Sequence, residues 1–182
     1  PKPEEPGSME VWEQTLVAEG VDALIPGSDY DLPPLAQVRD DWSARGVCEV
    51  MVSDLELVQT CRDKAVTCQV LERLGIPAPK AAWDLSEKEA VSWAKSNGYP
   101  VVMKPRDGMA SRNVHVVHDE EELKFFLPRT SFPVLQEHLN LDGAVEEFTC
   151  AVFVDRDGSP RETFIARREL AGGATYRAEV VD

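Results

Sequence analysis

The strongest constraint on the fold of this chain is a change in apolar patterning near Gly98. Before Gly98, stretches with helical spacing alternate with short apolar stretches, which predicts strands at residues 23–26 and 47–52 and helices at 9–19, around 35–42, 63–74 and 86–96. After Gly98 the pattern is that of strands, predicted at residues 101–104, 114–117, 134–137, 148–155 and 162–168. The order predicts an α/β part followed by an α+β part.

Two local patterns support these boundaries. Ser86 and Glu89 form a capping-box pattern at the start of a helix, and Asp155 to Gly158 predicts a hairpin turn between the last two strands. The alternation before Gly98 is typical of βα units around a parallel sheet. Two strands are few for a sheet that stands alone, so this first part is expected to be incomplete.

Composition excludes several classes of function. The chain of 182 residues is 43% hydrophobic, which suits a protein with a proper core, and its net charge of −14 repels phosphate backbones and anionic membranes. Apolar runs such as Pro100 to Met103 are too short to span a bilayer. We therefore expect neither nucleic-acid nor membrane binding.

The cysteines and the chain ends give weaker indications. The four cysteines are scattered without a Cys-x-x-Cys pair, so they are interpreted as reduced core thiols in a cytoplasmic protein without a zinc site. Residues 1–8 are rich in Pro, Glu and Gly and are interpreted as a linker or tag remnant. The strand-like end at residues 179–182 has no following turn, and we expect an interrupted strand there.

Two lysines occupy positions that stability alone does not explain. Lys64 follows Asp63 at a helix start, where the helix dipole favours an acid and disfavours a lysine. Lys104 ends the apolar strand Pro100–Met103 and is followed by Pro105. A buried ammonium group needs an anion, which for Lys104 is a carboxylate or a phosphate. Taken alone, Lys64 is also consistent with a solvated surface charge.

Polar residues near the ends of the later strands add candidate ligand contacts. The loop 106–114 contains Gly108 and Ser111, and small residues let backbone N–H groups approach a phosphate closely, although most such loops are simple turns. Gln136 and Glu137 end one predicted strand, and Glu147 opens another. Carboxylates at such ends can accept hydrogen bonds from a base or a sugar, and each alone is equally consistent with a solvated charge.

Taken in order, these motifs resemble the ATP-grasp superfamily. The resemblance is closest to carboxylate–amine ligases like the carbamoyl-phosphate synthase large chain, and it spans residues from Val21 onward. It is carried by Asp63-Lys64-x-x-Thr67, Leu74-Gly75-Ile76-Pro77-x-Pro79, Gly98-Tyr99-Pro100-Val101-Val102-x-Lys104-Pro105, Gln136-Glu137 and Glu147-Phe148-Thr149. It implies the end of a Rossmann-like domain at residues 9–60, followed at 61–182 by a partial ATP-grasp domain with a mainly antiparallel sheet.

The resemblance also implies roles for individual residues. ATP would lie between two lobes and phosphorylate a carboxylate, and an amine would attack the resulting acyl phosphate. Lys64 and Lys104 would hold the nucleotide phosphates under a lid that includes Gly108 and Ser111. The adenine would be read by Glu137 and the backbone near Leu139, and the ribose by Glu147. Gln136 would also belong to the nucleotide-binding residues. Arg167 and Arg168 would be phosphate or acyl-phosphate contacts, of which only one can face the site because strand neighbours alternate.

Departures from the family pattern limit what this chain is expected to do alone. The lid has Ala110 and Asn113 where glycines are expected. The family's magnesium ligands come later than residue 182, so we predict no metal site and no catalytic residues here, and no turnover by this chain alone. The partners would be a small carboxylate and an amine, and a homo-oligomer is left open. The alternative is a noncatalytic ATP-grasp-like module that binds nucleotide for regulation.

Overall fold

The computed structural model of the chain describes residues 5–108, 111–139, 146–155, 157–171 and 174–181. It divides into two compact units, Pro1–Arg73 and Leu74–Asp182, and each is described by itself. This division falls later than the boundary after Thr60 that the sequence predicted, and the Rossmann-like assignment of residues 9–60 stays a prediction.

The first unit is a small α/β arrangement. Its strands β1 (Ala23–Leu24) and β2 (Glu49–Val50) pair in parallel, as the alternating pattern predicted. The helices are α1 (Ser8–Ala18), α2 (Leu32–Arg45), α3 (Leu55–Arg62) and α4 (Lys64–Arg73). Trp42 and Leu35 of α2 are fully buried in its core, which also contains Leu16, Val47, Cys48 and Val50.

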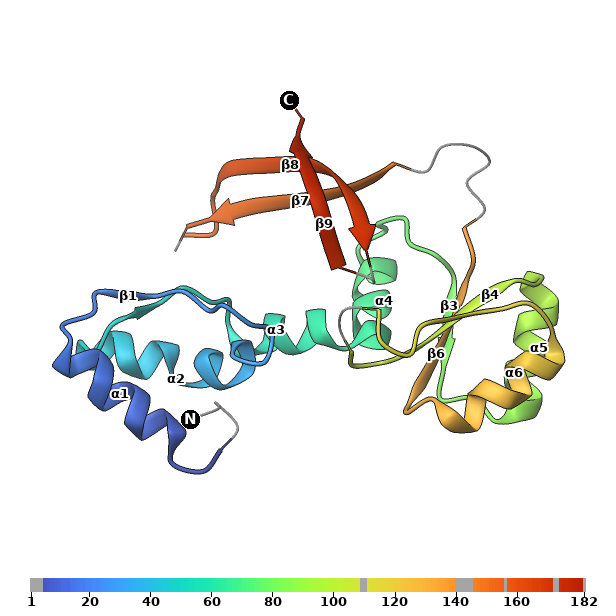
Figure 1. Cartoon of the computed structure of the whole chain (residues 1–182), viewed down its shortest axis with the longest axis horizontal. Coiled ribbons are helices and arrows are strands. Elements are labelled where there is room, and N and C mark those ends of the chain that lie inside the picture. Colours follow the sequence, from blue (N-terminus) through green and yellow to red (C-terminus); the bar gives the residue numbers. More distant parts are fainter. Residues whose placement is uncertain (1–4, 109–110, 140–145, 156, 172–173, 182) are drawn as a thin grey trace. The chain divides into compact units, whose positions relative to one another are not determined.

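The second unit begins with a four-stranded antiparallel sheet. Its strands lie in the order β3 (Ala81–Trp83), β6 (Pro133–Glu137), β4 (Val101–Pro105) and β5 (His115–Val117). The helices α5 (Glu87–Asn97) and α6 (Glu120–Phe126) lie next to each other beside this sheet (Figure 1), and the short 3-10 helix η1 (Leu127–Arg129) follows α6.

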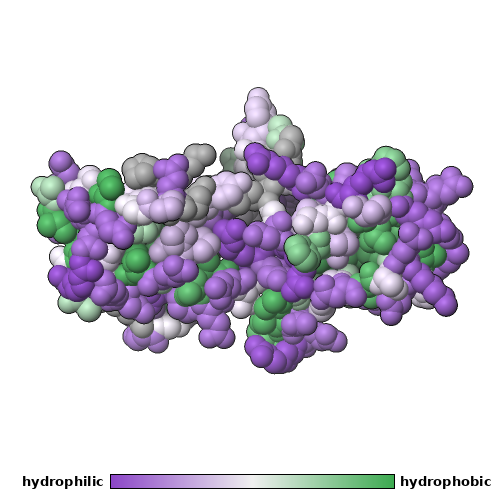
Figure 2. All heavy atoms as spheres, turned by 90° about the horizontal axis from the view of Figure 1, so that it is seen from below, coloured by the Kyte–Doolittle hydropathy of each residue, from purple (hydrophilic) through white to green (hydrophobic). Residues whose placement is uncertain are grey.

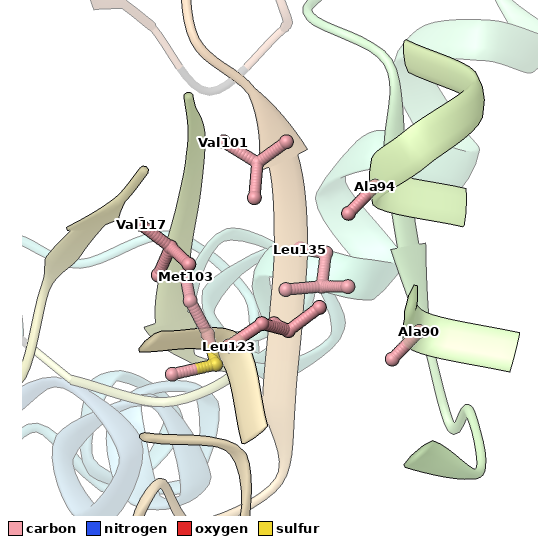
Figure 3. Close-up of a cluster of buried hydrophobic side chains, with 7 residues drawn as sticks. All are labelled: Ala90, Ala94, Val101, Met103, Val117, Leu123 and Leu135. Atoms are coloured by element: carbon pink, nitrogen blue, oxygen red, sulfur yellow. The ribbon is translucent and has the colours of Figure 1, made fainter. Parts of the chain in front are cut away.

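The core of this unit lies between one face of the sheet and the two helices. Val101 and Met103 alternate with Val102 and Lys104 along β4, and only the first two are completely buried. Figure 3 shows Leu135 of β6 directed toward Ala90 and Ala94 of α5, while Met103 lies beside Leu123 of α6. The small alanines let α5 approach the sheet closely, and Lys104 is left on the opposite face of β4.

Local interactions fix the two helices. At the start of α5, the Ser86 hydroxyl accepts a hydrogen bond from the Glu89 N–H and the Glu89 carboxylate accepts one from the Ser86 N–H, which confirms the predicted capping box. Glu120 of α6 contacts Lys124 at 2.6 Å and Lys95 of α5 at 2.5 Å. Hydrogen bonds from Lys124 and then Lys95 lower the pKa of the Glu120 carboxyl to about 2.

The last part of the second unit is a three-stranded antiparallel sheet. The strands β7 (Glu147–Val154), β8 (Pro160–Ala171) and β9 (Ala174–Val180) lie in chain order, and a β-bulge at Phe153 and Val154 shifts the register beside the β7–β8 turn. The turn at Asp155–Gly158 is the predicted hairpin. Large apolar side chains on both faces of this sheet are exposed, among them Phe148, Val152, Phe153, Phe164 and Val180.

The surface is mixed elsewhere too. On the face drawn in Figure 2, hydrophobic residues form small groups among hydrophilic ones. Among the described residues, no helix combines the length and the apolar character that a membrane span requires.

Most predicted elements are confirmed, and the misses have physical reasons. The sequence analysis missed β3, whose three residues are too few to show an alternating pattern. It missed α6, whose first turn is three consecutive acids with little apolar periodicity, and it recognised only the end of β9. The interpretation of all cysteines as core thiols was wrong. Of the four cysteines, only Cys48 is buried. Cys61 lies exposed near the end of α3, and Cys150 lies on the exposed three-stranded sheet.

Substitution of Leu135 by Ala should destabilise the four-stranded sheet by about 2–5 kcal/mol, because it leaves a cavity between β6 and α5 that the neighbouring alanines cannot fill. The control is Val116→Ala in the same sheet, where the native side chain is 43% exposed and the expected loss is below about 1 kcal/mol. Urea unfolding followed by the amide NMR signals of β4 and α5 measures both. Equal losses would contradict the placement of the core.

Candidate functional site

Lys104 is fixed on the sheet face that the helices do not cover. Its ammonium group donates a hydrogen bond to the Gln136 side-chain oxygen at 2.6 Å. Lys104 lies opposite Val134, and Gln136 lies opposite Val102, so the two polar residues are diagonal neighbours on one face of the sheet. Both are half-buried. The neutral amide orients the ammonium group while adding no negative charge of its own.

Glu137, the last residue of β6, is joined to Lys80 on the neighbouring segment. The Lys80 N–H donates to the Glu137 carboxylate at 2.9 Å, and the Glu137 N–H donates to the Lys80 carbonyl at 2.9 Å. Leu139, two residues further on, is 54% exposed. The chain leaving β6 therefore presents peptide groups next to a carboxylate whose orientation is fixed.

Lys80 was missed by the sequence analysis. It follows Pro79 and directly precedes β3, so the extended Pro77-x-Pro79 segment was a signal that a strand could begin there.

The loop after β4 adopts backbone geometry that usually requires glycine. Ser111 has φ of 53° and Asn113 has φ of 56°, both in the left-handed region. Ala110, the other departure from glycine, lies outside the described residues. Gly108 is exposed, and a Cβ there would make only ordinary contacts with Pro105. Asn113, where the resemblance leads one to expect a glycine, thus has a left-handed geometry that asparagine tolerates.

Two further contacts anchor the start of this loop. The Arg106 N–H donates to the Phe132 carbonyl at 3.0 Å, which extends the pairing of β4 and β6 by one residue. The Arg106 guanidinium lies 3.2 Å from the Asp84 carboxylate just after β3. These two contacts therefore fix the point at which the loop leaves the sheet.

Lys64 lies in the first unit, as the first residue of α4. The preceding Asp63 accepts hydrogen bonds from the Ala65 N–H at 2.9 Å and the Val66 N–H at 3.2 Å. This confirms that an acid suits this helix start. The Thr67 hydroxyl donates to the Thr60 carbonyl at 2.7 Å, which ties α4 to α3.

Glu147, Arg167 and Arg168 lie on the three-stranded sheet. Glu147 is directly opposite Arg168, with 3.4 Å between Glu147 Oε2 and Arg168 Nε. Arg167 is on the other face, as strand alternation predicted, and contacts Glu146 at 2.9 Å and Glu179 at 2.6 Å. The hydrogen bonds that Arg167 donates to Glu179 and, second, to Glu146 raise the pKa of its guanidinium group.

The predicted site residues therefore fall into three groups. On the four-stranded sheet the structure joins Lys104 with Gln136, while Glu137 lies at the far end of β6 and is joined to Lys80. On the three-stranded sheet it joins Glu147 with Arg168, and Lys64 belongs to the first unit. Partners that the sequence analysis missed are Lys80, Glu146 and Glu179. Within the ranges that the structure describes, no group of three or more His, Cys, Asp or Glu residues is arranged to hold a metal ion.

Comparison with known families assigns this region of the chain. Residues 61–144 match the ATP-grasp domain family. This segment includes Lys64, Lys104, Gln136 and Glu137, and it is similar to that family. Lys104, Gln136 and Glu137 lie on the four-stranded antiparallel sheet, whereas Lys64 lies on α4.

Two curated relatives are carbamoyl phosphate synthase large chains. The chain is 28% identical over 106 residues to the carbamoyl phosphate synthase large chain of Methanosarcina mazei, covering 58% of this chain and 10% of that protein. It is 35% identical over 102 residues to the same protein of Methanothrix thermoacetophila, covering 56% of this chain and 9% of that one. The chain thus spans about a tenth of the length of these relatives.

Solved structures of low sequence identity show the same fold. The biotin carboxylase–β-γ-ATP complex of Campylobacter jejuni matches with a TM-score of 0.71 at 17% identity, covering 92% of this chain and 39% of that one. The biotin carboxylase domain of the Hydrogenobacter thermophilus 2-oxoglutarate carboxylase, solved with MgADP and bicarbonate, matches with a TM-score of 0.60 at 21% identity. That match covers 72% of this chain and 31% of the other.

Replacing Asn113 by Ala should make the loop less stable than replacing it by Gly, by about 1 kcal/mol, because only glycine adopts a left-handed φ without strain. The matched control is Arg112, which is exposed in the same loop and has no positive φ. There Gly should be the less stable replacement. Unfolding free energies of the four variants test this, and the same order at both positions would contradict the left-handed geometry of Asn113.

Proposed function

We propose that this chain carries the adenine-nucleotide-binding part of an ATP-dependent carboxylate–amine ligase. The observation that carries the proposal is the hydrogen bond from Lys104 to Gln136 on the sheet face opposite to α5 and α6. Gln136 directly precedes Glu137, the last residue of β6. An ammonium group fixed in this way is suited to a phosphate. A carboxylate and free peptide groups nearby are suited to the amino edge of adenine.

The comparisons support the choice of nucleotide. The relatives are named as carbamoyl phosphate synthase large chains, and the two biotin carboxylase structures contain MgADP or are named as a β-γ-ATP complex. We infer the same class of nucleotide for this chain, whose residues 61–144 match the ATP-grasp domain family.

Charge gives an independent reason to expect localised phosphate contacts. A chain with a net charge of −14 repels a polyphosphate at long range, so binding depends on a few cations at short range. In the proposed arrangement Lys104 and Lys64 hold the phosphates, and the loop containing Gly108 and Ser111 covers them. Glu137 and the backbone near Leu139 accept hydrogen bonds from adenine and donate hydrogen bonds to it. Glu147 accepts hydrogen bonds from the ribose hydroxyls.

The proposed reaction has two steps. A carboxylate oxygen of the first substrate forms a bond to the γ-phosphorus of ATP while the bond to ADP breaks, which gives an acyl phosphate and ADP. The amine then attacks the acyl carbon, and phosphate leaves with the electron pair of the carbon–oxygen bond. Magnesium, when bound, neutralises charge on the phosphates during the first step. This chain's residues bind and orient the nucleotide for that step.

Substitution of Lys104 by Ala should weaken ATP binding about tenfold, because it removes a charge-assisted hydrogen bond to phosphate. Isothermal titration calorimetry at low and raised salt measures the affinity, and the difference between the proteins should shrink as salt screens the phosphate charge. Lys88→Ala is the matched control, since Lys88 is an exposed lysine of α5. Identical ATP affinity of the wild type and Lys104→Ala would refute the assignment.

A turnover experiment separates the ligase proposal from a noncatalytic module. Because the chain spans about a tenth of its curated relatives, we expect it to bind ATP without forming ADP. A longer protein that continues past residue 182 should form ADP when magnesium and the correct carboxylate are supplied. ADP formation by the 182-residue chain alone would overturn the incomplete site. Binding without ADP formation by the longer protein, across a panel of carboxylates, would favour the noncatalytic alternative.

A further inference from the structure

The pair formed by Glu147 and Arg168 differs from the other ion pairs of the three-stranded sheet. Glu147 Oε2 and Arg168 Nε lie 3.4 Å apart, both atoms are shielded from solvent, and neither makes a hydrogen bond within the described part of the chain. Arg167, on the opposite face, instead donates hydrogen bonds to Glu146 and Glu179. The Glu147–Arg168 contact is therefore an electrostatic pairing without the directed hydrogen bonds of its neighbour.

The surroundings of this pair restrict both side chains. Ala166, two residues before Arg168 on the same face, is completely buried, and Arg168 also lies 3.5 Å from the Thr175 hydroxyl of β9. The side chains of Glu147 and Arg168 remain 42% and 35% exposed. The Glu147 side chain therefore keeps exposed surface although its Oε2 atom is shielded from solvent.

These observations argue against a phosphate at Arg168. A phosphate bound there would lie close to the Glu147 carboxylate, and two anions at such a distance repel each other. A neutral donor has no such difficulty. Hydroxyl groups donate readily to a carboxylate oxygen, and a carboxylate whose orientation is already fixed loses less entropy when it binds them.

We propose that Arg168 is a positioning residue that orients Glu147 toward the ribose hydroxyls and makes no contact with the nucleotide phosphates. This inference rests on the proposed function, because it assumes that the chain binds an adenine nucleotide. It refines that function by assigning Arg168 to sugar recognition and by making the strand pairing of β7 and β8 a determinant of specificity for ribose.

The test compares ATP with 2′-deoxy-ATP in calorimetric titrations of the full 182-residue chain. The wild type should prefer ATP about tenfold, the value of one charge-assisted hydrogen bond. Glu147→Gln and Arg168→Met should both lose most of this preference, and Arg168→Lys should recover part of it. Arg167→Met is the matched control on the opposite face of the same strand, and its preference should equal that of the wild type.

Every other outcome overturns the inference about Arg168, and one of them also overturns the nucleotide proposal. If Arg168→Met weakens both nucleotides by one factor, Arg168 contacts something common to them, such as phosphate, and the inference is overturned. An equal loss of preference in Arg167→Met would assign the effect to the sheet as a whole and also overturn it. A wild type that binds both nucleotides equally overturns the inference and leaves the nucleotide proposal intact, whereas a wild type that binds neither overturns both.

A second variant keeps the test valid if Arg168→Met does not fold, as judged by its amide NMR spectrum. Arg168→Gln keeps a polar side chain that reaches about as far as Arg168 Nε and removes the charged guanidinium group. The same loss of ribose preference is expected from it. Retention of the wild-type preference in a folded Arg168→Gln would overturn the positioning role.

Discussion

The pairing of β4 between β5 and β6 is the constraint on which the second unit depends. Because successive side chains of a strand point to opposite faces, the pairing buries Val101 and Met103 against α5 and α6 and places Lys104 on the other face. The apolar residues hold the strand in register, and the register brings Lys104 beside Gln136. Packing and ligand chemistry thus depend on the same strand but on different faces of it.

This separation explains how an acidic chain can present an effective cation. Most of its arginine and lysine contacts, such as Arg45 with Asp41 or Arg161 with Asp157, are exposed ion pairs whose partners are screened by water. Lys104 is half-buried, and its ammonium group is oriented by the neutral amide of Gln136. Orientation lowers the entropy that a flexible surface lysine would lose when a phosphate binds.

Features set by neighbouring residues could be predicted from the sequence. The Ser86–Glu89 capping box, the end of β6 at Glu137 and the hairpin turn after β7 each depend on a few adjacent residues, and each is confirmed. The mainly antiparallel sheets were also predicted. The short strand β3 was not, because what makes it a strand is its pairing with β6, far away in the chain.

The pairing of Glu147 with Arg168 shows why site geometry was harder to predict. Near the turn, Val154 lies opposite Pro160, and that register continued along the hairpin would put Glu147 opposite Arg167. The β-bulge at Phe153 and Val154 shifts the pairing by one residue, so Arg168 faces Glu147 and Arg167 turns to the other face. The sequence predicted that the two arginines point to opposite faces of the sheet. No sequence pattern reveals the bulge, so the sequence could not show which arginine lies opposite Glu147.

The shared carboxylate of Glu120 has a consequence for how this chain can vary. One side chain serves Lys95 of α5 and Lys124 of its own helix, so the two lysines are coupled through it although they belong to different helices. If one lysine is replaced, the carboxylate still pairs with the other lysine. The stability lost on replacing both lysines therefore differs from the sum of the two separate losses. Residues 95, 120 and 124 are therefore an epistatic unit, in which the effect of any substitution depends on the other two.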